Sequence, residues 1–139
     1  MIATPRFVFL HLHKSGGTFV NECLLRFVPG ARQLGYHLPR SRIPAEFAGL
    51  PCIGLVRNPW AYYVSWYSFQ AGLPRQNPLF QVLSDGGRLD FAGTIRNMVT
   101  LADEPARLEA TVAALPPDYT NRGLNLPGFA LRGIASRQT

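Results

Sequence analysis

Two short segments of the sequence hold side chains suited to binding an anion. The first supplies one cation, two hydroxyls and two glycines in consecutive positions: Lys14, Ser15, Gly16, Gly17 and Thr18. The second pairs Arg57 with Ser65, eight positions further on. A guanidinium offers a planar fork that matches phosphate or sulfate, and glycines let the backbone approach a ligand closely. These residue types predict a site for phosphate or sulfate groups.

The first segment lies where a strand is expected to run into a helix. Residues 7–10 form an unbroken apolar run, which is typical of a strand buried on both faces. An amphipathic pattern follows from Thr18 to Val28 and predicts a helix. A helix N-terminus gathers unpaired N–H groups and the positive end of the helix dipole. The glycine loop is therefore expected to present that N-terminus to the anion.

The second segment has the same strand, loop and helix order. Residues 52–56 predict another buried strand, Asn58 and Pro59 predict the start of a helix, and that helix should run to about Gln70. Two such strands with a helix between them predict parallel pairing. Arg57 and Ser65 would then reach one crevice at the carboxyl edge of the sheet. Taken alone, an ordinary surface arginine and a small helix residue explain this pair equally well.

The rest of the chain predicts helices and carries no motif. Short helical patterns cover residues 78–83, 90–101 and 103–115, and the tail from Asp118 has no clear periodicity. At 139 residues the chain is long enough for one domain with a real core, and 47% hydrophobic and 16% charged residues are typical of a globular α/β protein. We therefore expect a single α/β domain with a helical C-terminal half.

Charge and composition exclude several classes of protein. The net charge is +6, and residues 1–57 hold seven Lys or Arg against two Asp or Glu, so the positive excess accompanies the glycine loop. Nucleic acid is not expected as a partner, because the sequence lacks a basic helix, zinc-ligand spacing and an RNP-like aromatic pattern. No run of about 18 apolar residues or signal peptide is present, which predicts no membrane span. Cys23 and Cys52 are expected to be buried thiols in a reducing cytoplasm.

The two segments together resemble motifs of the sulfotransferase family. Residues 11–18, His-Leu-His-Lys-Ser-Gly-Gly-Thr, look like the family's 5′-phosphosulfate loop, H-x-P-K-[TS]-G-G-T. Residues 53–59, Ile-Gly-Leu-Val-Arg-Asn-Pro, with Val-Ser-Trp-Tyr at 64–67, look like its 3′-phosphate motif, V-x-R-[DN]-P followed by V-S-x-Y. The resemblance covers residues 6–70 and is nearest to carbohydrate sulfotransferases and their bacterial relatives. Residues 71–139 match no family motif.

The resemblance implies a P-loop NTPase-like parallel sheet flanked by helices. It also implies a donor, 3′-phosphoadenosine 5′-phosphosulfate, whose sulfuryl group passes to a hydroxyl of a carbohydrate or small molecule. Lys14 would stabilise the leaving phosphate, while Ser15, Gly16, Gly17 and Thr18 would cradle the 5′ group. Arg57 and Ser65 would bind the 3′-phosphate. Such a transfer mostly needs positioning and charge stabilisation, so no metal is expected.

A general base should take the proton of the acceptor hydroxyl, and His37 is the candidate that the resemblance favours. It looks like a family histidine that follows a glycine, although Tyr36 intervenes here. A histidine satisfied by a loop carbonyl is the structural alternative, and Glu22 is the other candidate base. His11 and His13 would share one face of a strand, but no third metal ligand lies nearby. His13 stands where the family usually has proline.

Two other functions remain open. The catalytic domains of the family are typically longer, so the chain is alternatively a fragment or an inactive remnant that binds the donor or another nucleotide. A nucleotide kinase or NTPase is less favoured. Its usual loop, G-x-x-x-x-G-K-[ST], places the lysine after the glycines, whereas Lys14 precedes them.

Overall fold

The computed structural model describes residues 1–115, 127–128 and 130–131. The chain divides into two compact units, Met1–Tyr62 and Tyr63–Thr139. Whether both act as one domain over residues 1–139 stays a prediction. The irregular tail expected from Asp118 lies mostly outside the described residues. Each unit is described by itself below.

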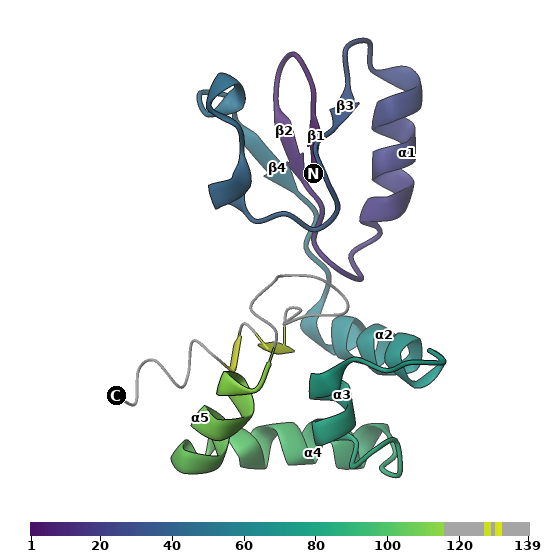
Figure 1. Cartoon of the computed structure of the whole chain (residues 1–139). Coiled ribbons are helices and arrows are strands. Elements are labelled where there is room, and N and C mark those ends of the chain that lie inside the picture. Colours follow the sequence, from purple (N-terminus) through teal and green to yellow (C-terminus); the bar gives the residue numbers. More distant parts are fainter. Residues whose placement is uncertain (116–126, 129, 132–139) are drawn as a thin grey trace. The chain divides into compact units, whose positions relative to one another are not determined.

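The first unit contains a small mixed sheet of four strands, in the order β3-β1-β2-β4 (Figure 1). The strands are β1 (Ile2–Ala3), β2 (Val8–Leu10), β3 (Arg32–Gln33) and β4 (Cys52–Gly54). β2 and β4 pair in parallel, which confirms the predicted parallel pairing. β1 runs antiparallel to both β2 and β3. The fold is therefore α/β as expected, but the prediction of a purely parallel sheet is wrong.

A tight turn explains the antiparallel part of the sheet. The backbone N–H and the hydroxyl of Thr4 both donate to the carbonyl of Phe7, at 2.9 and 2.8 Å. The Thr4 hydroxyl oxygen also accepts from the backbone N–H of Phe7 at 3.0 Å. A turn this short joins neighbouring strands that run in opposite directions. The hairpin of β1 and β2 follows from it, and the sequence analysis missed β1 because it is only two residues long.

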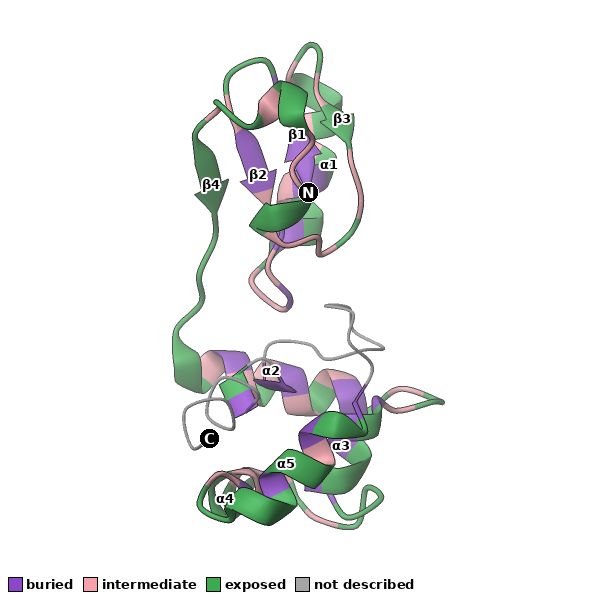
Figure 2. Ribbon diagram, turned by 60° about the vertical axis from the view of Figure 1, so that its left-hand side comes forward, coloured by how far each residue is buried: buried purple, intermediate pink, exposed green. Residues whose placement is uncertain are grey.

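Burial differs sharply between the two parallel strands (Figure 2). Val8 and Phe9 of β2 are buried, as the apolar run predicted, whereas every residue of β4 is exposed. The prediction of a second buried strand is therefore wrong. β4 is the last strand in the sheet order and has only β2 as a neighbour. For the same reason Cys52 is exposed and not a buried thiol, while Cys23 is half-buried.

Helix α1 and two single turns of 3₁₀ helix complete the first unit. α1 (Gly17–Phe27) follows β2 and contacts β1 and β3 (Figure 1). The two short turns, η1 (Arg40–Arg42) and η2 (Ala45–Phe47), lie between β3 and β4. An ion pair between Arg32 and Glu46 links β3 to η2. The connection from β3 to β4 is thus compact although it holds little regular structure.

Helix α2 (Pro59–Ala71) begins where the sequence predicted. The side-chain oxygen of Asn58 accepts hydrogen bonds from the backbone N–H groups of Trp60 and Ala61, at 3.0 and 3.3 Å. This is the ordinary N-cap arrangement, and Pro59 takes the first helical position, where its missing N–H costs nothing. The start of α2 is therefore encoded locally, directly after Arg57.

The described part of the second unit is helical, as predicted. It contains most of α2 together with α3 (Pro78–Leu83), α4 (Phe91–Ala102) and α5 (Pro105–Ala113). α4 contacts both α3 and α5. The rings of Trp66 and Phe80 meet edge to face at 5.5 Å, and Leu101 and Leu108 are fully buried. Among the described helices, none has both the length and the apolar character needed to cross a membrane.

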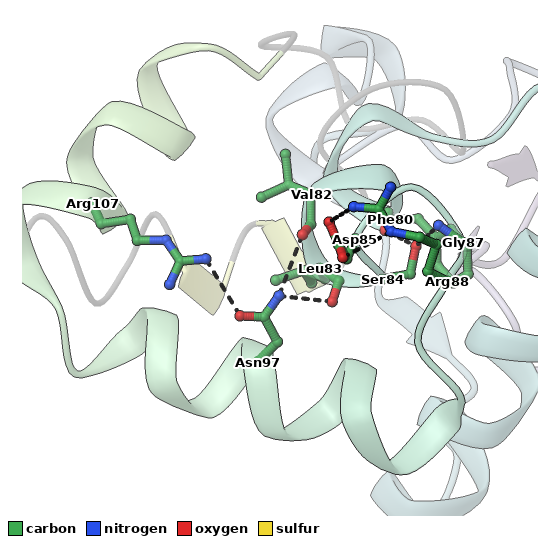
Figure 3. A network of polar contacts seen from close by, with 9 residues as sticks. All are labelled: Phe80, Val82, Leu83, Ser84, Asp85, Gly87, Arg88, Asn97 and Arg107. Atoms are coloured by element: carbon green, nitrogen blue, oxygen red, sulfur yellow. Dashed lines mark hydrogen bonds and ion pairs between the residues drawn. The ribbon is translucent and has the colours of Figure 1, made fainter.

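Polar contacts fix the end of α3 against α4 (Figure 3). The amide nitrogen of Asn97 donates to the carbonyl of Leu83 at 2.9 Å, and Arg107 donates to the amide oxygen of Asn97 at 3.4 Å. Arg88 pairs with Asp85 in the turn that follows α3, at 2.6 Å. The last carbonyls of a helix have no partner within it. Asn97 supplies one from the neighbouring helix and so ties the two helices together.

Candidate anion-binding site

The loop between β2 and α1 has a backbone that glycine makes possible. Gly16 is the N-cap of α1, with a φ of 84° in the left-handed region, and Lys14 also has a positive φ, of 56°. The Ser15 hydroxyl donates to the carbonyl of Leu12 at 2.7 Å, which closes the loop on itself. Because Gly16 carries no side chain, nothing of the N-cap residue covers the first N–H groups of the helix. Thr18 is exposed beside them.

The ring of His11 packs against the start of α1. Its ring is 5% exposed and lies so close to Gly17 that a Cβ at that position would come within 2.1 Å of the ring. The side-chain nitrogen of buried Asn21, one turn into α1, lies 3.0 Å from His11 Nδ1. Gly17 is therefore required for close packing. His11, which directly follows β2, thus contacts both Gly17 and Asn21 of the helix.

Arg57, which follows β4, reaches the loop that follows β2. Its Nη1 donates to the backbone carbonyl of Lys14 at 3.2 Å, although the two residues lie 43 positions apart. The pKa of Lys14 is lowered from its ordinary value, chiefly by burial and then by the charge of Arg57. Two cations from the two segments thus lie close enough to disfavour each other. A negatively charged ligand between them would relieve that repulsion.

His37 also lies beside this loop. Its backbone has a φ of 52°, and its Nδ1 is 3.2 Å from the carbonyl of His11. Its ring stacks on that of His13, with ring centroids 3.6 Å apart and an interplanar angle of 22°. The carbonyl contact is the one expected of a structural histidine, but it occupies only Nδ1. The role of His37 as a base stays a prediction, and Glu22, exposed on α1, stays the alternative.

The three histidines form a cluster that disfavours positive charge. Burial, followed by the proximity of His37, lowers the pKa of His11 to about 4 and that of His13 to about 3. The pKa of His37 is lowered as well, again mainly by burial. The rings are therefore neutral at pH 7. Within the described residues, no group of three or more His, Cys, Asp or Glu side chains is arranged to hold a metal ion.

Sequence reasoning missed two members of this site. The stacking of His13 on His37 depends on a contact across 24 positions of sequence, which no local pattern indicates. Asn21 lies four residues after Gly17 and so on the same face of the helix. That spacing was the one available signal for its contact with His11.

Ser65 belongs to the second unit. It is half-buried in α2, about two turns after the N-cap. Its predicted cooperation with Arg57 stays a prediction. The first loop, Arg57 and His37 are the predicted site residues that the structure brings together within the first unit.

Comparison with known proteins adds no assignment. No protein-family model matches the chain, and neither the curated proteins nor the solved structures gave a significant match. The resemblance to sulfotransferases therefore depends on the two sequence motifs alone.

Replacement of Gly17 by alanine should destabilise the first unit. The added Cβ would overlap the ring of His11, and overpacking of this kind typically costs about 1–3 kcal/mol. Gly49→Ala is the matched control, because no atom lies within 4 Å of its Cβ position. Urea unfolding followed by the NMR signals of β2 measures both variants. Equal midpoints for Gly17→Ala and Gly49→Ala would contradict the packing described here.

Proposed function

We propose that this chain binds 3′-phosphoadenosine 5′-phosphosulfate and transfers its sulfuryl group to a hydroxyl of a carbohydrate or small molecule. The observation that carries the proposal is the hydrogen bond from Arg57 to the carbonyl of Lys14. It joins a residue of each sulfotransferase-like motif in one place. A P-loop-type arrangement of strand, loop and helix is part of the proposal and is supported by the parallel pairing of β2 with β4.

The charges around the loop support an anionic ligand. Lys14 is the only lysine of the chain, and it lies half-buried where burial and Arg57 both work against its charge. A cation in such a place is stabilised when an anion binds, because the two charges attract more strongly where water is partly excluded. The N-terminus of α1 adds N–H donors and a favourable dipole. A phosphosulfate, which is negative along its length, fits this combination.

The reaction assigns each group a task. The acceptor oxygen attacks the sulfur and forms a new S–O bond, while the bond from sulfur to the bridging oxygen of the donor breaks. Its electron pair remains on the departing 3′-phosphoadenosine 5′-phosphate, where Lys14 stabilises the developing charge. The proton of the acceptor hydroxyl passes to His37, whose Nε2 remains as the ring's acceptor. Arg57 holds the 3′-phosphate and so positions the donor, a role that the motif resemblance also gives to Ser65.

Removal of Arg57 should weaken binding of 3′-phosphoadenosine 5′-phosphate, the product of the donor. Hydrogen bonds to charged groups contribute about 1.5–3 kcal/mol, so Arg57→Ala should raise the Kd at least tenfold. Arg6→Ala is the control: Arg6 is an exposed arginine of the same unit that precedes β2, whereas the glycine loop follows β2. Isothermal titration calorimetry at fixed salt measures all three proteins.

The same calorimetry separates the proposal from a nucleotide kinase. ATP with magnesium should bind more weakly than the 3′,5′-bisphosphate, since the chain lacks the usual kinase loop. Tighter binding of ATP that requires magnesium would overturn the sulfotransferase assignment. An equal loss of affinity in Arg6→Ala and Arg57→Ala would show that only general positive charge is being measured.

Lys14→Ala should lower turnover strongly while leaving much of the product affinity. Loss of one group that stabilises transition-state charge typically lowers kcat by about a hundredfold or more. Lys14→Arg keeps a charge and should retain more activity than the alanine variant. Release of ³⁵S-labelled sulfate ester from labelled donor, with a panel of hydroxyl acceptors, measures the rate. Binding without turnover in the wild type would indicate an inactive donor-binding protein.

A further inference from the structure

The stack between His13 and His37 is a feature of this chain that the sulfotransferase motif does not explain. His13 precedes Lys14 directly, occupies the place where the motif has proline, and is 1% exposed. Its ring lies nearly parallel to that of His37 at 3.6 Å. A proline could not present a flat ring in this way. The first loop therefore carries a side chain that covers one face of the predicted base.

His37 is held in a conformation that needs support. A φ of 52° is uncommon for a residue other than glycine and costs free energy unless surrounding contacts fix it. Two contacts do so here: the stack on His13, and Nδ1 at 3.2 Å from the carbonyl of His11. Because a carbonyl only accepts, Nδ1 must carry the hydrogen. In the neutral ring this leaves the lone pair on Nε2.

Burial and one nearby charged group favour a neutral His37. The ring of His11 lies 4.3 Å away at 58°, the ring of His13 stacks on His37 at 3.6 Å, and Lys14 follows His13 in sequence. The amino group of Met1, which donates to the carbonyl of Gly35 at 2.5 Å, also disfavours a positive charge on His37. Opposing these, the hydrogen bond to His11 favours the protonated ring of His37, and His11 and His13 have no such favourable contribution. A proton that enters the cluster therefore goes to His37.

We propose that His13 is a positioning residue for His37. Its ring covers one face of His37 and holds Nδ1 against the His11 carbonyl. Nε2 is thereby kept as the single proton acceptor next to the lysine loop. The geometric part of this proposal stands on the stack itself. The statement that Nε2 accepts the proton of the acceptor hydroxyl rests on the proposed function.

NMR of the histidine side chains tests the geometric part without any need for turnover. In the wild type, His37 should show one tautomer, with the hydrogen on Nδ1, and a pKa below its ordinary value of 6.5. His13→Ala should mix the tautomers and raise the His37 pKa toward 6.5, because water would reach the uncovered face. His13→Phe keeps a flat ring without a titrating group. It should preserve both the tautomer and the lowered pKa.

Kinetics test the part that rests on the proposed function. The pH profile of kcat should move to higher pH in His13→Ala, with a roughly tenfold lower kcat at pH 7 and an unchanged KM for the donor. His13→Phe should restore both. An altered tautomer without any turnover in the wild type would uphold the positioning and defeat the sulfotransferase assignment.

Two results would overturn the proposal itself. One is a wild-type His37 with mixed tautomers or a pKa of 6.5. The other is His13→Ala with the tautomer, pKa and pH profile of the wild type. If His13→Ala does not fold, the comparison between the wild type and His13→Phe decides, because loss of the single tautomer in His13→Phe would show that a covering ring is not what positions His37.

Discussion

The parallel pairing of β2 with β4 is the constraint on which the candidate site depends. Its register places Leu10 opposite Gly54, so both strands end at the same edge of the sheet. The chain leaving β2 enters the glycine loop, and the chain leaving β4 reaches Arg57 three residues later. This pairing is what brings Arg57 to the carbonyl of Lys14, 43 positions away in the sequence. A slip of one residue would also turn the alternating side chains of β2 away from the core.

Much of the local structure was predictable because its signals are local. The cap at Asn58, the proline that follows it and the apolar run of residues 7–10 each specify an element within a few residues. The exposure of β4 was not predictable in this way. An apolar run reads the same whether it becomes a central strand or the last strand of a sheet, and only the pairing partners decide between them. The two-residue strand β1 gave no periodicity to detect.

The candidate site shows the same division. Lys14 and Arg57 were identifiable from residue type and spacing, and their meeting follows from parallel strands. The contacts of His11 with Gly17 and of His13 with His37 connect residues in different elements and depend on packing. A sequence pattern predicts which groups are present at an edge of a sheet. It does not predict which side chains pack against each other. The stacking of His13 on His37 is therefore visible only in the structure.

The account depends most directly on the statement that Lys14 and Arg57 bind the same ligand, Lys14 at its 5′-phosphate and Arg57 at its 3′-phosphate. Lys14 is the only lysine, so ¹³C-lysine labelling of the chain gives one side-chain signal. Its chemical shift, followed by NMR against pH, measures the pKa of the Lys14 amino group. The free protein should show a Lys14 pKa below its ordinary value of 10.5, and Arg57→Ala should raise that pKa by removing a neighbouring cation. Saturating 3′-phosphoadenosine 5′-phosphate should raise it in the wild type. A Lys14 pKa that responds neither to Arg57→Ala nor to the bisphosphate would contradict the account.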